Sequence, residues 1–277
     1  MIVPGSASQE IAAALADELD EPLSAVEYDR FADGEMLVRI PDADERAIVV
    51  ASTVSDGAHV ELLQLQDAAR ERAEEVVTVL PYMGYGRQDK TFEAGQPVSA
   101  RAMARAISTG TDRVVTVNPH EEIVCDFFEV PCTAVDAAGR LAEPLSELSE
   151  PLFLSPDSGA IELAETVREA YGSGETDYFE KVRHSDTDVE IQPSDADTTG
   201  RDVVLVDDII ATGSTMSTAI SQLSTPDRVF VTCVHPILAS NARSKLATAG
   251  VDAVYGTDTV ERAVSSVSVA PAIAEEL

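Results

Sequence analysis

The sequence predicts an α/β fold of parallel β-sheets whose faces are covered by helices. Short β-branched apolar runs recur along the 277 residues, and amphipathic helical stretches separate them. The second half of the chain repeats this alternation, which indicates two domains of similar construction. The stretch LAEPLSELSEP reads as a helix end and linker near residues 137–150, so we predict domains at 1–140 and 141–277.

The first half supplies the clearer strand and helix patterns. Its expected strands are short and apolar: AIVVAS (47–52), VVTVLPY (76–82), RVVTV (113–117) and CTAV (132–135). Helices are expected at 59–73, where apolar residues recur on one face, and at 97–108, which opens with Pro. Asp33-Gly34 before the run EMLVRI predicts a hairpin turn.

The second half follows the same scheme. Its expected strands are PLFLSPD, RDVVLVDD, RVFVTCVHP and VDAVYG, and its expected helices are DSGAIELAETVREAYG, GSTMSTAISQL and ASNARSKLATAG. The stretch DYFEKVR also reads as a strand, which puts Lys181 and Arg183 on one face. The polar segment that follows, 184–200, is expected to be a mobile loop that closes over a site and excludes water.

Composition excludes several classes of protein. There are 50 acidic residues against 19 Lys plus Arg, a formal charge of −31, so nucleic acid is not an expected partner. No apolar run approaches the ~18 residues of a membrane span, and the start lacks a signal-peptide pattern, so we expect a cytoplasmic protein.

The same composition indicates a salty cytoplasm, because at ~1 M salt the Debye length is only ~3 Å and the self-repulsion of such a surface is screened. Lysine is scarce: Lys90, Lys181 and Lys245 are the three, and Lys245 fits an ordinary surface position in a helix. Cys125, Cys132 and Cys233 show no paired or metal-binding spacing, so we expect small core residues.

The stretch VVLVDDIIATGST (203–215) carries the strongest chemical signal. Ligands of open parallel sheets bind beyond the carboxyl ends of the strands, where Asp207 and Asp208 emerge. The loop that follows, 211–215, offers backbone N–H groups, two hydroxyls and a glycine before a helix, which is typical of an anion site. Carboxylates beside such a loop need hydroxyls or a bridging cation to face, and a sugar phosphate satisfies both. A capped helix after a strand is the alternative.

Other candidate residues are weaker when taken singly. Arg87, after the second strand, presents a planar fork of donors suited to phosphate, and Gln88 a neutral donor, although a solvated loop is the simpler interpretation. His120, taken alone, fits a structural role, and Lys181 with Arg183 fits a solvated basic pair. The chain contains no P-loop string, so any ATP site is of another kind.

Taken together, these segments resemble the ribose-phosphate pyrophosphokinase family over nearly the whole chain, most closely its short archaeal forms. The segments that carry the resemblance are FADGE (31–35), PYMGYGRQDK (81–90), GQPVSARAMARAI (95–107), NPHEEIVCDFF (118–128), SPDSGA (155–160), EKVR (180–183), VVLVDDIIATGST (203–215) and YGTDTVERAVSSVSVAPAIAEEL (255–277). The resemblance implies two tandem phosphoribosyltransferase-like, Rossmann-like domains.

It also implies an activity and a set of residues. The activity is transfer of the diphosphoryl group of ATP to the 1-hydroxyl of ribose 5-phosphate, which gives phosphoribosyl pyrophosphate and AMP. The implied ATP-binding residues are Phe31, Asp33, Glu35, Arg87, Gln88 and His120. The implied ribose 5-phosphate residues are Asp207, Asp208, Ala211, Thr212, Gly213, Ser214 and Thr215.

The family further implies a catalytic pair, Lys181 and Arg183, and metal ligands His120 and Asp157 for Mg²⁺, with Mn²⁺ as the alternative. Residues 31–35 would reach into a neighbouring subunit, which implies a homo-oligomer, a dimer or a hexamer.

The chain departs from the family pattern at Asn118, where many relatives carry Asp, and this puts metal affinity and metal choice in question. Ala211 and Ser214 also differ from the commonest loop residues. Two alternatives stay open: a type I phosphoribosyltransferase, and a catalytically silent regulatory homologue.

Overall fold

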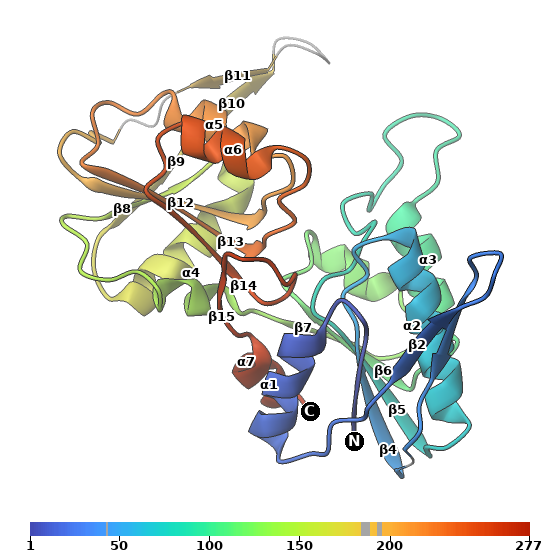
Figure 1. Ribbon diagram of the computed structural model, residues 1–277. Helices are drawn as coiled ribbons and strands as arrows, with labels where there is room; N and C mark the ends of the chain where they lie inside the picture. The colour runs from blue at the N-terminus through green and yellow to red at the C-terminus, as the bar shows by residue number, and fades with distance from the viewer. Residues whose placement is uncertain (43, 184–188, 193–195) are drawn as a thin grey trace. The chain divides into compact units, whose positions relative to one another are not determined.

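The computed structural model in Figure 1 describes residues 1–42, 44–183, 189–192 and 196–277, with only the backbone at 180–183 and 189–192. Two compact units divide the chain. The first comprises residues 1–136, 258–261 and 268–277, and the second comprises residues 137–257 and 262–267. Among the described residues, no helix has the length and apolar character needed to cross a bilayer.

The division differs from the predicted domains at the C-terminus. The first break follows Asp136, close to the predicted boundary, but the last ten residues belong to the first unit. Helix α7 (Ala270–Ala274) packs there against α1 (Gln9–Leu19). Arg46 donates to the Leu277 carbonyl oxygen at 2.9 Å and Arg113 to that of Glu276 at 2.9 Å, which ties the end of the chain to the first sheet.

The first unit is built on a parallel sheet in the order β1-β4-β5-β6-β7. Its strands are β1 (Ile2–Pro4), β4 (Arg46–Val50), β5 (Glu75–Leu80), β6 (Arg113–Val117) and β7 (Cys132–Val135). Helices α2 (Asp56–Arg70) and α3 (Ser99–Ser108) cover one face, and α1 and α7 lie on the other (Figure 1). The predicted strands at 113–117 and 132–135 are confirmed residue for residue.

The remaining elements of the first unit are a hairpin and a short helical segment. Strands β2 (Glu27–Arg30) and β3 (Met36–Arg39) pair antiparallel, so the hairpin predicted from Asp33-Gly34 is confirmed. The β3 strand packs on α2. Between β6 and β7 the chain forms the 3₁₀ segment η1 (Glu122–Phe127).

The second unit is built on a parallel sheet in the order β15-β14-β13-β12-β8-β9. Its strands are β8 (Leu152–Ser155), β9 (Glu175–Tyr178), β12 (Asp202–Ile209), β13 (Arg228–His235), β14 (Ala253–Thr257) and β15 (Ser265–Val267). Helices α5 (Ser214–Ile220) and α6 (Ala242–Thr248) cover one face, and α4 (Ile161–Tyr171) covers the other with the 3₁₀ segment η2 (Ala138–Ala142) (Figure 1).

Alternation along β12 shows why this sheet needs two covered faces. Val203 and Leu205 belong to the core cluster that contains Met216 of α5 and Leu246 of α6. The intervening Val204 is fully buried as well, and α4 packs against the same strand. Side chains of successive strand residues point to opposite faces, so a continuous apolar run predicts a strand buried on both sides.

The polar segment after Lys181 contains a strand that the sequence did not predict. Strand β10 (Glu180–Arg183) pairs antiparallel with β11 (Val189–Gln192), within the stretch expected to be a loop. The short alternation VEIQ supplies the pairing strand. Residues 184–188 and 193–195 of the predicted closing loop lie outside the described residues.

Candidate active site

The candidate residues of the second unit gather at the carboxyl ends of its parallel strands. Asp157 lies two residues beyond the end of β8, and Asp207 and Asp208 are near the carboxyl end of β12, just before its last residue, Ile209. Because β8 and β12 are hydrogen-bonded neighbours in a parallel sheet, their carboxyl ends lie at one edge. Residues that are fifty positions apart in the sequence therefore lie at the same edge of the sheet.

Asp207 and Asp208 are oriented by the backbone that follows each of them. Asp207 Oδ1 accepts the Asp208 N–H at 3.0 Å, and Asp208 Oδ1 accepts the Ile209 N–H at 2.7 Å. Burial raises the pKa of Asp207 well above its usual range, and the charge of Asp208, a hydrogen bond with it and the charge of Asp157 raise it further. The end of the strand therefore brings several carboxylates close together, and their mutual repulsion makes the ionised form of Asp207 less favourable.

The loop 211–215 turns sharply between β12 and α5. Gly213 caps α5 with φ 70°, in the left-handed region that favours glycine. The Ala211 carbonyl accepts the Ala239 N–H at 2.8 Å, which fixes the start of the loop to the segment before α6. Thr212 Oγ1 lies 3.2 Å from Ser214 Oγ, so the two hydroxyls share one side of the turn.

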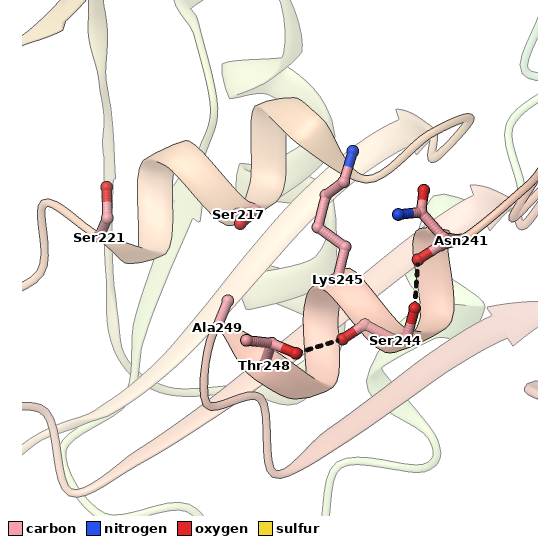
Figure 2. A pocket seen from close by; sticks show the side chains of 7 residues that line it. All are labelled: Ser217, Ser221, Asn241, Ser244, Lys245, Thr248 and Ala249. Carbon is pink, nitrogen blue, oxygen red and sulfur yellow. Dashed lines mark hydrogen bonds between the residues drawn. The ribbon is translucent and has the colours of Figure 1, made fainter.

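Lys245 reaches this loop from α6, thirty-one positions further along the chain. Its Nζ donates to Ser214 Oγ at 2.7 Å. The ammonium borders a pocket of about 350 Å³ between α5 and α6, shown in Figure 2. The sequence suggested an ordinary surface lysine at this position, and the structure instead connects it to the candidate site.

The first unit presents its candidates on loops. The hairpin loop 31–35 is closed by the Phe31 N–H, which donates to the Glu35 carbonyl at 2.8 Å. Asp33 Oδ1 accepts the Glu35 N–H at 3.1 Å, and Gly34 has φ 94°. Phe31 is 55% exposed, and both carboxylates of the loop are exposed. The ring and carboxylates are thus held out from the unit by a tight turn.

Arg87 is presented by a loop anchored at two points. Gly84 N–H donates to Thr53 Oγ1 at 2.8 Å, and a Cβ at Gly84 would lie 2.1 Å from the Thr53 carbonyl oxygen, so only glycine fits. Gln88 Nε2 donates to the Pro97 carbonyl at 3.1 Å and Gln88 Oε1 accepts the Ser99 hydroxyl at 2.9 Å. These bonds tie Gln88 to the start of α3, a positioning role that the sequence did not predict.

Tyr85, which is part of the same loop, contacts Asp56 and His59 of α2 and so holds the loop to that helix. Tyr85 has φ 63°, and its hydroxyl donates to Asp56 Oδ1 at 2.5 Å. The His59 ring lies 5.5 Å from the Tyr85 ring, and burial lowers the pKa of His59 although the charge of Asp56 opposes the shift. The motif contains Tyr85 but not its partners, because Asp56 and His59 belong to α2 and meet the loop only after folding.

His120 follows β6 and is exposed. Asn118, two residues earlier, has φ 33° and its Nδ2 donates to Asp136 Oδ1 at 2.7 Å. An aspartate at position 118 would set two carboxylates against each other at that distance. The Asn118 amide therefore links the ends of β6 and β7, a bond that an aspartate at this position would lose.

Comparisons with known proteins then decide the family. Residues 1–110 match the N-terminal domain of ribose phosphate pyrophosphokinase, and residues 133–258 match the phosphoribosyl transferase domain. A ribose-phosphate pyrophosphokinase of Halobacterium salinarum is 63% identical over 281 residues, with 100% of both chains covered. The chain belongs to the ribose-phosphate pyrophosphokinase family.

More distant relatives agree with this assignment. A ribose-phosphate pyrophosphokinase of Methanosarcina mazei is 44% identical, covering 100% of this chain and 94% of that one. The crystal structure of phosphoribosylpyrophosphate synthetase from Mycobacterium smegmatis superposes with a TM-score of 0.84 at 28% identity, over 100% of this chain and 96% of that one. The predicted fold, two phosphoribosyltransferase-like α/β domains with parallel sheets flanked by helices, is confirmed.

The pyrophosphokinase residues predicted for metal binding lie one in each unit, His120 in the first and Asp157 in the second. Asp157 Oδ1 accepts the Gly159 N–H at 2.9 Å, so one oxygen caps η3 (Ser158–Ala160). Within the part of the chain that the structure describes, no group of three or more His, Cys, Asp or Glu residues could hold a metal. The Asp157 carboxylate is a donor of the kind that Mg²⁺ takes, because that ion commonly uses one or two protein carboxylates and completes its shell with phosphate and water.

The remaining predicted catalytic residues of the pyrophosphokinase are placed by backbone alone. Lys181 pairs with Ile191 and Arg183 with Val189 in the β10–β11 hairpin. They stay predictions for the catalytic pair.

The expectation that the cysteines are small core residues is met in part, because Cys125 and Cys132 are only half-buried. Cys125 of η1 and Cys132 of β7 are brought together, with their sulfurs 2.9 Å apart, although their spacing gave no sign of pairing. Cys233 is buried as expected.

Proposed function

We propose that the chain transfers the diphosphoryl group of ATP to the 1-hydroxyl of ribose 5-phosphate, releasing AMP and forming phosphoribosyl pyrophosphate for nucleotide synthesis in the cytoplasm. The observation that carries the proposal is the end of β12, where two oriented carboxylates precede the loop 211–215 in a chain that matches the pyrophosphokinases over its full length.

The ribose half of the site follows from that geometry. Asp207 and Asp208 accept hydrogen bonds from the 2- and 3-hydroxyls of the sugar, which places the 1-hydroxyl for attack. The 5-phosphate binds to loop 211–215 through backbone N–H groups and through the Thr212, Ser214 and Thr215 hydroxyls. Gly213 supplies the positive φ that the turn of this loop requires.

The nucleotide half lies on the loops of the first unit. Phe31 packs against adenine, and the Asp33 and Glu35 carboxylates accept hydrogen bonds from its exocyclic amine. Because this loop is exposed on its own unit, we propose that a neighbouring subunit completes the pocket. Arg87 binds phosphate oxygens from a loop that Gln88 holds to α3.

The chemical step is an in-line displacement. The 1-hydroxyl oxygen forms a bond to the β-phosphorus, the bond from that phosphorus to the bridging oxygen of AMP breaks, and the hydroxyl proton leaves. Mg²⁺ would bind with ATP, with His120 and Asp157 as its predicted ligands, and would supply positive charge to the phosphate oxygens. Lys181, Arg183 and Arg87 bind the charge that develops on the transferred and leaving oxygens, and positioning accounts for the rest of the rate.

The test is AMP formation from ATP with and without ribose 5-phosphate, in Mg²⁺ or Mn²⁺ and molar KCl. We expect formation that depends on ribose 5-phosphate and that falls at least ~100-fold in Lys181→Ala. Arg168→Ala, which removes a positive charge from α4, is the matched control and should keep wild-type activity. If the folded wild-type protein binds ATP yet forms no AMP with either metal, the proposal is wrong and the silent regulatory homologue takes its place.

A further inference from the structure

Helix α6 forms a fixed wall against the loop 211–215. A Cβ at Gly213 would lie 3.4 Å from Leu246 Cγ and 3.5 Å from the Ala242 carbonyl oxygen, so the loop backbone rests directly on this helix. The bond from Ala239 N–H to the Ala211 carbonyl, at 2.8 Å, joins the two segments again. Leu246 is fully buried. A side chain on the loop-facing side of α6 is therefore held at a set distance from the loop.

Lys245 is that side chain. It is half-buried, whereas Arg243 on the same helix is exposed. The Lys245 ammonium donates to Ser214 Oγ at 2.7 Å, and Ser214 Oγ lies 3.2 Å from Thr212 Oγ1. An ammonium carries three donors, so one bond to a hydroxyl uses only part of its capacity.

Among the side chains that the structure describes, no acidic partner is found for Lys245 of the kind that this chain supplies elsewhere. Acidic residues outnumber Lys plus Arg by 50 to 19, and Lys90 lies 3.8 Å from Asp89. Among the described ion pairs, none involves Lys245. The pocket beside it is lined by Ser217, Ser221, Asn241, Ser244, Thr248 and Ala249, without a carboxylate (Figure 2). A cation kept among hydroxyls and amides is suited to an anionic ligand.

We propose that Lys245 binds the 5-phosphate of ribose 5-phosphate together with the loop hydroxyls, an inference that rests on the proposed function. The phosphate must bind near Asp207 and Asp208, whose charges oppose it. Since the Debye length at ~1 M salt is ~3 Å, a distant positive patch contributes little and a cation in contact is needed. Lys245 supplies one at the loop itself, and it selects the phosphorylated sugar.

The first experiment compares KM values for ribose 5-phosphate and for ATP in wild type, Lys245→Ala and Lys245→Arg. Loss of a charge-assisted hydrogen bond should raise the KM for ribose 5-phosphate ~10-fold or more in Lys245→Ala. The KM for ATP and kcat should change less than twofold, and Lys245→Arg should recover most of the loss. Arg243→Ala removes the same charge from the same helix two residues away, and it should behave as wild type.

A second set of variants separates contact with the phosphate from support of Ser214. If Lys245 acted only by holding the Ser214 hydroxyl, Ser214→Ala would reproduce the effect and the double variant would add nothing. We expect Lys245→Ala to raise the KM for ribose 5-phosphate more than Ser214→Ala does. The double variant should have a higher KM than either single variant. Equal effects with no further loss in the double variant would overturn the inference.

Thr215→Ala distinguishes failure of this inference from failure of the proposed function. If Thr215→Ala raises the KM for ribose 5-phosphate while Lys245→Ala does no more than Arg243→Ala, the loop binds the phosphate and Lys245 does not. If the wild-type protein shows no activity that depends on ribose 5-phosphate, the proposed function itself fails. Calorimetric titration of ribose 5-phosphate and of ribose then provides the direct reading: Lys245→Ala should weaken binding of the phosphorylated sugar alone.

Discussion

The two units present their candidate residues in different ways. In the second unit, Asp207, Asp208 and loop 211–215 lie close together in the sequence, at the end of a strand that is buried on both faces. In the first, the hairpin loop 31–35, the loop with Arg87 and the residue His120 are separate exposed pieces. A contiguous motif at the end of a strand can be predicted from the sequence. The positions of separate loops depend on hydrogen bonds and packing contacts that are seen only in the folded chain.

The largest effect is expected at the carboxyl end of β12. Asp207→Asn removes a charged acceptor for the ribose hydroxyls, so the KM for ribose 5-phosphate should rise ~10- to 100-fold. Steady-state kinetics at fixed ATP measures this. Asp202→Asn is no substitute as a control, because Asp202 binds Arg228, so Asp197→Asn on an exposed loop serves instead and should leave KM unchanged.

The same variant should stabilise the protein. Burial and the charges of Asp208 and Asp157 raise the folded-state pKa of Asp207, so the native state binds this proton more tightly than the unfolded chain. Stability from that proton is present at low pH and is lost as pH rises through the raised pKa. Asp207→Asn should therefore melt above wild type near neutral pH, by roughly 2–4 °C, and the gap should narrow as pH falls. A lower melting temperature at every pH would contradict the raised pKa.

The next largest effect tests the loops of the first unit. Gly84→Ala puts a Cβ 2.1 Å from the Thr53 carbonyl oxygen, so the backbone must move and the loop that carries Arg87 moves with it. We expect a loss of about 1–3 kcal/mol in the free energy of unfolding and a higher KM for ATP. Gly57→Ala in α2 is the matched control, because its Cβ would meet only Ser55 Oγ at 3.8 Å. Equal stability of the two variants would show that the loop is not anchored at Gly84.

The same contrast explains which features of the fold and of the candidate site could be predicted from the sequence. The strands β6 and β7 and the site after β12 were predicted because apolar runs and consecutive polar residues are local signals. The end of β12 was missed by one residue, because the strand continues past the two carboxylates to Ile209. The bond from Lys245 to Ser214 was not predicted, because it joins positions that only the packing of α5 on α6 brings together.

A smaller effect concerns the pH dependence of stability near His59. Burial lowers the folded-state pKa of His59, with Asp56 and Tyr85 as the charged and titratable neighbours that face it. The unfolded chain therefore binds more protons between that lowered pKa and ~6.5, and stability falls as pH drops below ~6.5. In His59→Gln this part of the loss should disappear. Urea unfolding at several pH values measures the free energy of unfolding as a function of pH. If that free energy falls equally with pH in both proteins, the role of His59 is refuted.

The smallest effect distinguishes the thiols of the two units without altering stability. The Cys132 thiol donates to Cys125, which lowers the pKa of Cys125, while the same bond and burial raise the pKa of Cys132. Burial raises the pKa of Cys233 on β13 as well. Because thiolates are the reactive form, iodoacetamide at pH 8 should label Cys125 first, then Cys132, and Cys233 only after unfolding.

Peptide mass spectrometry over time gives the order, and Cys132→Ala should slow the labelling of Cys125 because its thiolate loses a donor. Cys233→Ala is the control that should leave the rate at Cys125 unchanged. Faster labelling of Cys233 than of Cys125 in the native protein would mean that the strands of the second unit open more readily than the loops of the first. That result would reverse the contrast between a site built on a rigid strand and one built on supported loops.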